Sequence, residues 1–179
     1  MFFMQKLSTI AVKFAVPKPL PTKEEIEAWD LAACLEYGRE ALHHFRGDRD
    51  ELLQRRNVLI TSQFGDLSPV LREVVMLSLA AEDIVTARKV VGWLEEAGDP
   101  AMGYYVHLAM ADRGDSHLGD EFLISAAHRG HFPAQRVLLD RRARERGLFS
   151  PFIFLASRVA HAWRVYQVAK RNPKDLRLK

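Results

Sequence analysis

Apolar positions recur with helical spacing along most of the chain, and glycine or proline residues separate the apolar runs. Between residues 83 and 97, for example, Ile84, Ala87, Val91 and Leu94 fall at three- and four-residue steps. This spacing is typical of amphipathic helices that bury one face. Aliphatic residues and alanine dominate the apolar set, whereas glycine and proline are sparse. The pattern therefore predicts an all-α chain.

The same spacing predicts a helix that begins after Thr22 and ends at Gly47. Thr22 is a candidate N-cap, and the glutamates that follow it favour the positive end of the helix dipole. Two more helices are expected, one from Asp50 to near Gly65, with Ile60 in its apolar set, and one that Ser68 caps. The apolar face of the first helix comprises Ile26, Trp29, Ala33, Tyr37, Ala41 and Phe45.

Two stretches in the middle of the chain follow one plan. In each, fourteen residues lead from a proline to a glycine, and another glycine shortly precedes the proline. The two prolines are thirty-three residues apart and the two preceding glycines thirty-two. Self-similarity at this period is typical of stacked two-helix repeats, and a degenerate unit is expected over residues 50–82. The residues concerned are Gly98, Pro100, Gly114, Gly130, Pro133 and Gly147.

The stretch LISAAHRGHFPAQRVL, from Leu123 to Leu138, resembles the Sel1-like branch of the tetratricopeptide-like repeats. In that family a helix ends in Ala-Ala-x-x-Gly, followed by His, Asn or Asp, a short turn and an alanine-rich helix. Residues 96–101 match the same turn one unit earlier, so the resemblance covers about residues 83–147. It implies an α-solenoid whose concave face binds peptides or protein surfaces. The matching residues are Ala126, Ala127, Gly130, His131 and Ala134.

The segment before the predicted repeats is apolar and basic. Lysines interrupt it too often for the apolar core of a secretory signal, roughly 7–15 residues, although its acid-free character also resembles an organelle transit peptide. Prolines at positions 17, 19 and 21 predict an extended conformation. We expect residues 1–21 to form an arm that docks Phe2, Phe3 and Phe14 on the repeat domain, residues 22–149, or on a neighbouring molecule.

Residues 150–179 are predicted to form a long amphipathic helix, from Ser150 to about Asn172, and a basic tail. Its apolar arc contains Phe152, Leu155, Val159, Trp163 and Tyr166. Such a helix either lies on a membrane surface or closes the open end of a repeat array, and the capping role is favoured. A membrane span needs about 20 apolar residues, and no apolar run approaches that length. Trp163, Arg164 and Tyr166 are the candidate contact residues.

Charge is distributed unevenly behind the formal net charge of +3. Residues 1–20 carry +3, residues 21–131 carry −9, and residues 132–179 carry +9. This asymmetry favours end-to-end association or a polyanionic partner, although such charges also simply solvate opposite ends of a chain. The single cysteine, Cys34, cannot form an internal disulfide. We therefore expect a reducing intracellular compartment, the cytoplasm, with the mitochondrion as the alternative.

An arginine cluster near the end of the predicted repeats is the sharpest chemical feature. Arginine suits bidentate contacts with phosphate or carboxylate groups. No aromatic residue is interleaved with the cluster, so an acidic protein surface is favoured over a nucleic-acid backbone. The cluster and the preceding aromatic segment supply the candidate partner-binding residues: Tyr104, Tyr105, His107, Arg136, Arg141, Arg142 and Arg146. Arg144 belongs to the same cluster.

Catalytic and metal-binding patterns are weak. His128 and His131 lie close in sequence, but zinc requires three or four convergent ligands, and Gly130 separates the pair. Acidic residues concentrate at predicted helix ends, where capping accounts for them. No phosphate-binding loop or nucleophile motif is present in the sequence. We therefore predict no enzymatic activity, no metal and no cofactor.

These features predict a non-catalytic helical-repeat module that mediates protein–protein interaction as an adaptor or scaffold. The alternative is a structural subunit of a large assembly, membrane-associated or ribonucleoprotein, which docks through the N-terminal arm and the basic C-terminal helix. One protein or several subunits of one complex are the expected partners. Peripheral membrane contact and nucleic acid are the less favoured ones.

Overall fold

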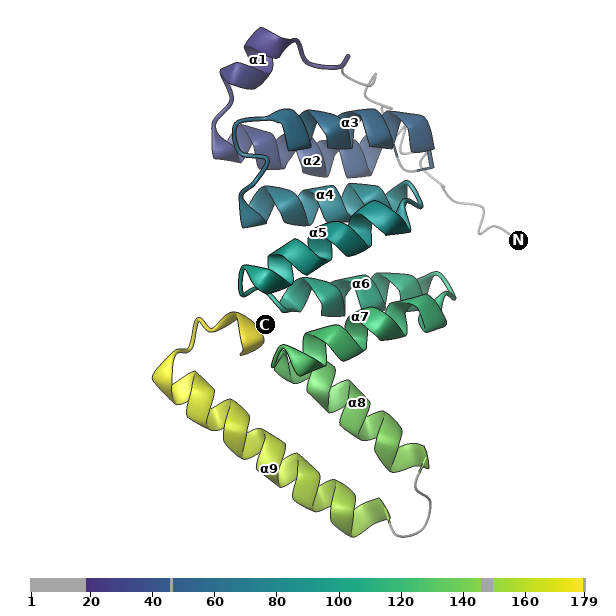
Figure 1. Ribbon diagram of the computed structural model, residues 1–179, viewed down its shortest axis with the longest axis vertical. Helices are drawn as coiled ribbons and strands as arrows, with labels where there is room; N and C mark the ends of the chain where they lie inside the picture. The colour runs from purple at the N-terminus through teal and green to yellow at the C-terminus, as the bar shows by residue number, and fades with distance from the viewer. Residues whose placement is uncertain (1–18, 46, 146–149, 179) are drawn as a thin grey trace, which may run out of the picture.

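The computed structural model describes residues 19–45, 47–145 and 150–178, and over these residues it is helical, with no strand. The helices follow one another along the long axis of the molecule (Figure 1). They are α1 (Lys23–Glu27), α2 (Leu31–His44), α3 (Arg49–Thr61), α4 (Ser68–Ala80), α5 (Ile84–Glu96), α6 (Ala101–Asp112), α7 (Ser116–His128), α8 (Phe132–Glu145), α9 (Ser150–Arg171) and the short 3₁₀ helix η2 (Leu176–Leu178).

The single helix predicted from Thr22 to Gly47 is in fact two helices, α1 and α2. Thr22 caps α1 as expected, because its hydroxyl accepts a hydrogen bond from the Glu25 N–H while the Glu25 carboxylate accepts one from the Thr22 N–H. The helix then ends at Glu27. Asp30 caps α2 by accepting a hydrogen bond from the Ala33 N–H, with 2.7 Å between oxygen and nitrogen. The carboxylate of Asp30 therefore starts a new helix within a continuous apolar pattern.

The next two helices also begin differently from the prediction. Asp48, not Asp50, caps α3, and its carboxylate lies 3.2 Å from the Glu51 nitrogen. Leu67 occupies the N-cap position of α4, so that Ser68 lies inside the helix. On α3, Ile60 is exposed although the spacing predicts it on the apolar face, whereas Arg55 is buried. Arg55 is accommodated because its guanidinium lies 4.0 Å from the Phe45 ring centroid and binds the Glu51 carboxylate at 2.8 Å.

Four turns between consecutive helices share one geometry and recur every sixteen residues. Each contains a residue with φ between 58° and 91°: Glu82, Gly98, Gly114 and Gly130. The N–H of the following residue then donates to the carbonyl five residues earlier at 2.8–3.0 Å, which is the Schellman closure of a helix end. These bonds join Asp83 to Ser78, Asp99 to Leu94, Asp115 to Met110 and His131 to Ala126.

Each helix from α2 to α8 contacts the next one, and α2 also contacts α4. Buried apolar side chains form a continuous cluster from Cys34 in α2 to Phe122 in α7. A second cluster around Leu123 and Ala134 joins α7 to α8. Gly119 brings α6 and α7 close together, because a Cβ at that position would lie 3.1 Å from the backbone oxygen of His107. The apolar interior thus extends along the stack as far as α8.

The C-terminal end of the stack is formed by α8 and α9, which pack against each other. After α9 the chain returns, and η2 contacts α8. In Figure 1, η2 consequently lies beside the middle of the molecule, whereas α9 lies at its edge. The side of α9 that faces away from α8 is the outer surface of this end.

Candidate functional site

The outer face of α9 carries a row of exposed apolar side chains. Its members are Leu155, Val159, Trp163 and Tyr166, which are 62%, 62%, 61% and 54% exposed. They are spaced three or four residues apart and therefore lie on one side of the helix. The rings of Trp163 and Tyr166 are in contact, with 5.7 Å between their centroids. We call these four residues the α9 row. An apolar row of this kind, unlike singly exposed apolar residues, is a candidate interaction surface.

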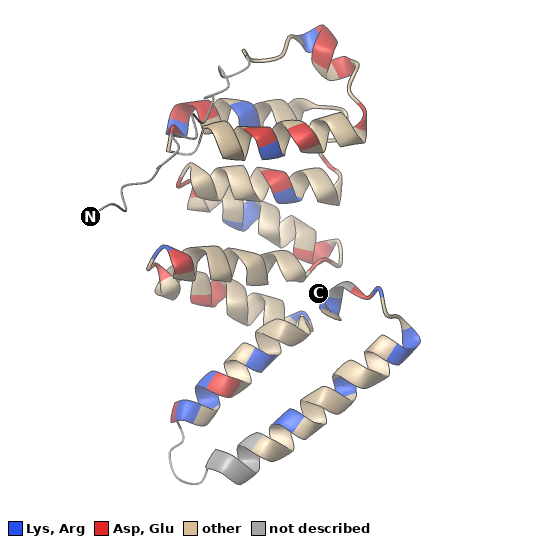
Figure 2. Ribbon diagram, turned by 180° about the vertical axis from the view of Figure 1, so that it is seen from behind, with Lys and Arg blue, Asp and Glu red and all other residues tan. Residues whose placement is uncertain are grey.

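Basic side chains border the α9 row. Lys170 and Arg171 are exposed on the same helix. Arg158 instead reaches α8, where its Nη2 lies 2.9 Å from each carboxylate oxygen of Asp140. Figure 2 shows that Lys and Arg predominate on α8, α9 and the C-terminal segment, whereas acidic residues concentrate on the preceding helices. The border therefore gives this end of the molecule a positive potential.

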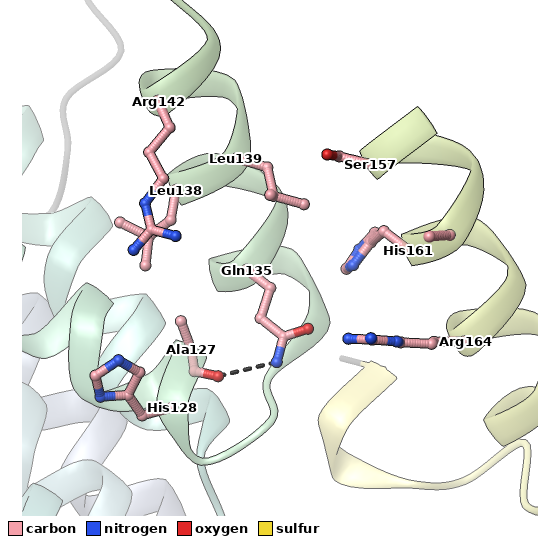
Figure 3. A pocket seen from close by; sticks show the side chains of 10 residues that line it. Ala127, His128, Gln135, Leu138, Leu139, Arg142, Ser157, His161 and Arg164 are labelled. Carbon is pink, nitrogen blue, oxygen red and sulfur yellow. Dashed lines mark hydrogen bonds between the residues drawn. The ribbon is translucent and has the colours of Figure 1, made fainter. Parts of the chain in front are cut away.

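A groove of about 380 Å³ lies between α7, α8 and α9. From α9, His161 and Arg164 extend toward α8, and Arg142 and Gln135 extend from α8 (Figure 3). The Gln135 side-chain amide donates a hydrogen bond to the Ala127 carbonyl at 3.0 Å, which orients it at the floor of the groove. The complete lining is Ala127, His128, Gln135, Leu138, Leu139, Arg142, Ser157, Ala160, His161 and Arg164.

The groove has a strongly cationic lining. It contains two arginines and two histidines but no carboxylate. Within the described residues, neither Arg142 nor Arg164 forms an ion pair, whereas nearby Arg141 binds Asp120 and Arg158 binds Asp140. Burial lowers the pKa of His161, the positive charges of Arg136 and Arg164 lower it further, and Asp140 acts in the opposite direction. The groove is therefore a place where an anion is electrostatically stabilised.

The predicted arginine cluster is divided among several faces of α8. Arg141 points toward α7, where its Nη1 lies 2.6 Å from the Asp120 carboxylate. Arg142 lines the groove described above, and Arg136 lines a second pocket with Phe132, Val165 and Leu178. Arg144 is exposed. The structure therefore does not place these arginines on one continuous contact face.

The predicted aromatic contact residues differ in their exposure. Tyr105 is half-exposed on α6, whereas Tyr104 packs against the second apolar cluster and contacts the His131 ring at 5.0 Å between centroids. His107 is only 4% exposed, so its ring lies inside the helix stack. Trp163, Arg164 and Tyr166, in contrast, are all exposed on α9. Among the described contact residues, the Trp163 and Tyr166 rings are in contact on the exposed row, whereas His107 and Arg141 meet inside the stack.

His107 belongs to a polar cluster between α6, α7 and α8. Its Nδ1 lies 3.7 Å from the Asp120 carboxylate, and its Nε2 lies 3.5 Å from Nη2 of Arg141. Burial is the main cause that lowers the pKa of His107, and the charge of Arg141 acts in the same direction. A hydrogen bond with the Gly119 backbone and the charge of Asp120 oppose it. The imidazole is therefore favoured in its neutral form, as a buried part of the packing.

The two histidines considered as metal ligands have different surroundings. His131 is buried and caps α8, because its Nδ1 accepts a hydrogen bond from the Ala134 N–H at 3.3 Å. His128 is exposed and lines the groove. In the residues that the structure covers, no three His, Cys, Asp or Glu side chains are grouped to hold a metal ion. None of the described helices is long and apolar enough to cross a lipid bilayer.

Several predicted contact residues lie outside the described part of the chain. These are the arm residues Phe2, Phe3 and Phe14, and Arg146 at the end of the arginine cluster. Comparison with protein-family models, with curated proteins and with solved structures finds no significant match in any of the three. The function of the chain is therefore inferred from the geometry of α8 and α9.

The groove is not predicted by the sequence pattern, although part of its signal is visible there. Ser157, His161 and Arg164 follow a four- and three-residue spacing, so they share one face of α9. Gln135 and Arg142 are seven residues apart and share one face of α8. Nothing local indicates that these two faces are opposed across a groove, because that depends on how α8 and α9 pack.

Proposed function

We propose that this chain is a non-catalytic helical-repeat protein that binds a protein partner through the α9 row. The partner segment that fits this surface is an amphipathic helix with an acidic border. The exposed row Leu155, Val159, Trp163 and Tyr166 is the observation that carries the proposal. Basic Lys170 and Arg171 supply the charge that selects an acidic partner.

The position of α9 in the stack supports a helical partner. From α2 to α8 the apolar side chains form continuous clusters that the adjacent helices cover. No described segment covers the outer face of α9 in the same way. A further helix placed there would continue the order of the stack and bury the row. The three- and four-residue spacing of the row is that of a seam between two packed helices.

The recurrence of the turns supports the repeat architecture. Schellman turns sixteen residues apart indicate helices of nearly equal length, and two such helices make a unit of thirty-two residues, the period predicted from Gly98 and Gly130. We infer that α4 to α8 form successive halves of α-solenoid units, consistent with the Sel1-like resemblance. A solenoid presents extended surfaces for protein recognition and needs a specialised element at each end.

A second candidate function is a structural subunit that docks on an anionic membrane surface through α9. The adjacent rings of Trp163 and Tyr166 and the basic border favour it, because such side chains occur together on interfacial helices. An interfacial helix immerses a broad apolar face, however, whereas the α9 row is a narrow seam. The helical protein partner is therefore the preferred proposal.

Binding to the native partner and to membranes can be separated by experiment. Full-length protein is used as bait in native cell extract treated with nuclease, and each captured protein is purified and titrated directly. The proposal predicts saturable binding to a protein that contains an acidic amphipathic helix. Binding is weakened by Trp163→Ala and unaffected by Trp93→Ala, which removes an exposed tryptophan on α5. Binding only to phosphatidylserine vesicles, or equal effects of the two variants, overturns it.

A further inference from the structure

We propose that the groove between α7, α8 and α9 binds the phosphate group of a small soluble molecule. The site is separate from the α9 row, so the inference is independent of the proposed protein partner. On α9, Ser157, His161 and Arg164 face the groove. The residues of the row lie on the opposite side of the same helix, as the helical spacing requires.

Two arginines provide the principal recognition. Arg142 from α8 and Arg164 from α9 line the same groove, and within the described chain neither has an acidic partner. The structure neutralises neighbouring arginines instead, since Asp120 binds Arg141 and Asp140 binds Arg158. Guanidinium groups form planar, bidentate hydrogen bonds with phosphate oxygens. Each of these unneutralised guanidinium groups is therefore suited to bind a phosphate oxyanion that enters the groove.

The rest of the lining fits a small organic phosphate. The hydroxyl of Ser157 and the rings of His128 and His161 add polar groups, whereas Leu138 and Leu139 supply an apolar wall. A volume of about 380 Å³ falls within the range of small-ligand sites. Such sites usually combine a mostly apolar lining with a small number of polar groups. The polar groups would hold the phosphate, and the leucines would contact the remainder of the molecule.

His161 provides a reporter of the bound ligand. Its pKa is lowered by burial, then by Arg136 and Arg164, while Asp140 opposes them. Arg142 and His128 line the same groove from α8 and α7. A phosphate placed among these groups adds negative charge and raises the pKa of His161. Histidine NMR titration with and without ligand measures this change.

The direct test is calorimetric titration of the full-length protein with sodium pyrophosphate, with sodium acetate at equal ionic strength as the reference. We expect one pyrophosphate per chain. Arg142→Gln and Arg164→Gln should each weaken binding by roughly tenfold or more, because each removes charge-assisted hydrogen bonds. Arg144→Gln removes the same charge from an exposed position on α8 outside the groove and should leave binding within about twofold. Circular dichroism verifies that all variants are folded.

Three outcomes overturn the inference. The first is the absence of pyrophosphate binding, and the second is equal weakening by Arg144→Gln, which would indicate a nonspecific charge effect. The third arises with vesicles of phosphatidylcholine and phosphatidic acid. Binding to these vesicles without binding of soluble pyrophosphate would assign the groove to a lipid headgroup rather than to a small molecule. Pyrophosphate should raise the pKa of His161 in the wild type but not in Arg164→Gln. That result supports the inference independently of the calorimetric titration.

Discussion

The guanidinium of Arg72 binds the carboxylate of Asp99, with 2.7 Å from Nε and 2.6 Å from Nη2 to the same oxygen. These two residues are twenty-seven positions apart in the sequence, and so are Arg56 and Asp83. The Nη1 atom of Arg56 lies 2.5 Å from a carboxylate oxygen of Asp83. Each residue of the Arg56–Asp83 pair thus lies sixteen positions before its counterpart in the Arg72–Asp99 pair. At the equivalent positions two turns further on, thirty-two residues later, the rings of Tyr104 and His131 contact each other. Each such contact ties a helix to a turn that lies two helices later.

Loss of the Arg72 side chain should destabilise the protein more than loss of an exposed arginine. The Asp99 side chain is only 3% exposed, against 43% for Arg72, so Arg72→Ala leaves a buried carboxylate without its cation. We expect the free energy of unfolding to fall by about 1–3 kcal/mol. The control is Arg88→Ala, which breaks a pair with Glu121 whose side chains are 56% and 65% exposed. That variant should lose less than about 1 kcal/mol.

Urea denaturation of both variants measures the difference. Equal losses for Arg72→Ala and Arg88→Ala would show that the recurring bridge to the turn has no special structural role.

The backbone conformation of Gly98 should limit substitution there. Its φ is +88° and a Cβ added at this position would meet nothing within 4 Å, so Gly98→Ala tests the backbone conformation alone. We expect a loss of about 1–2 kcal/mol in unfolding free energy. Gly92 lies within α5 with equally open surroundings. Gly92→Ala should therefore stabilise the protein by about 0.5–1 kcal/mol. Effects of the same sign, compared by thermal unfolding, would refute the assigned turn geometry.

The buried ring of His107 predicts a decline in stability on the acid side. Because its pKa is lower in the folded state than its ordinary value of 6.5, the unfolded state binds more protons as pH falls through that value. The free energy of unfolding therefore keeps the contribution of this ring above about pH 6.5 and loses it progressively as the pH falls below that value. His161 contributes in the same direction.

Unfolding free energies of the wild type and of His107→Gln, measured between about pH 5 and pH 8, check this prediction. The variant should show a shallower slope, whatever its absolute stability. Gln54→Asn, which changes an exposed side chain on α3 without a titratable group, should keep the wild-type slope. A slope unchanged by His107→Gln would contradict the buried neutral state of this ring.

The α9 row should contribute little to folding. Trp163 is exposed, so Trp163→Ala should change the free energy of unfolding by less than about 0.5 kcal/mol. Leu123, fully buried in α7, gives the opposite expectation, and Leu123→Ala should cost about 2–5 kcal/mol. If Trp163→Ala destabilised the protein to a similar extent, the row would serve the fold rather than a partner.

The sequence predicts the helical class, and glycine marks three of the four recurring turns. Gly98, Gly114 and Gly130 are identifiable because glycine adopts positive φ at low cost. Glu82 adopts φ of 58° in the equivalent turn and carries no such local signal. The break before Asp30 escapes prediction for a different reason. Apolar spacing continues from Ile26 through Trp29 to Ala33, whereas the cap at Asp30 decides where the helix starts.

The candidate surfaces depend on tertiary structure to different degrees. The α9 row is visible in the sequence as an apolar arc, but periodicity does not distinguish a buried face from an exposed one. Its exposure follows from the order in which the helices stack. The pairing of Arg72 with Asp99 is not predicted, although arginines at 56, 72 and 88 and aspartates at 83, 99 and 115 share the sixteen-residue spacing. Arg88 departs from that rule by binding Glu121.

Photo-crosslinking is the most direct test of whether a helical protein partner covers the outer face of α9. A photoreactive amino acid replaces Val159 in the α9 row, and in a matched control it replaces Val85, an exposed valine on α5. After irradiation in the native cell, mass spectrometry identifies the crosslinked peptides. We expect position 159, but not position 85, to crosslink to one acidic, amphipathic helical segment of a single protein. Crosslinks from position 159 to lipid or nucleic acid, or identical products from both positions, would show that no such partner covers α9.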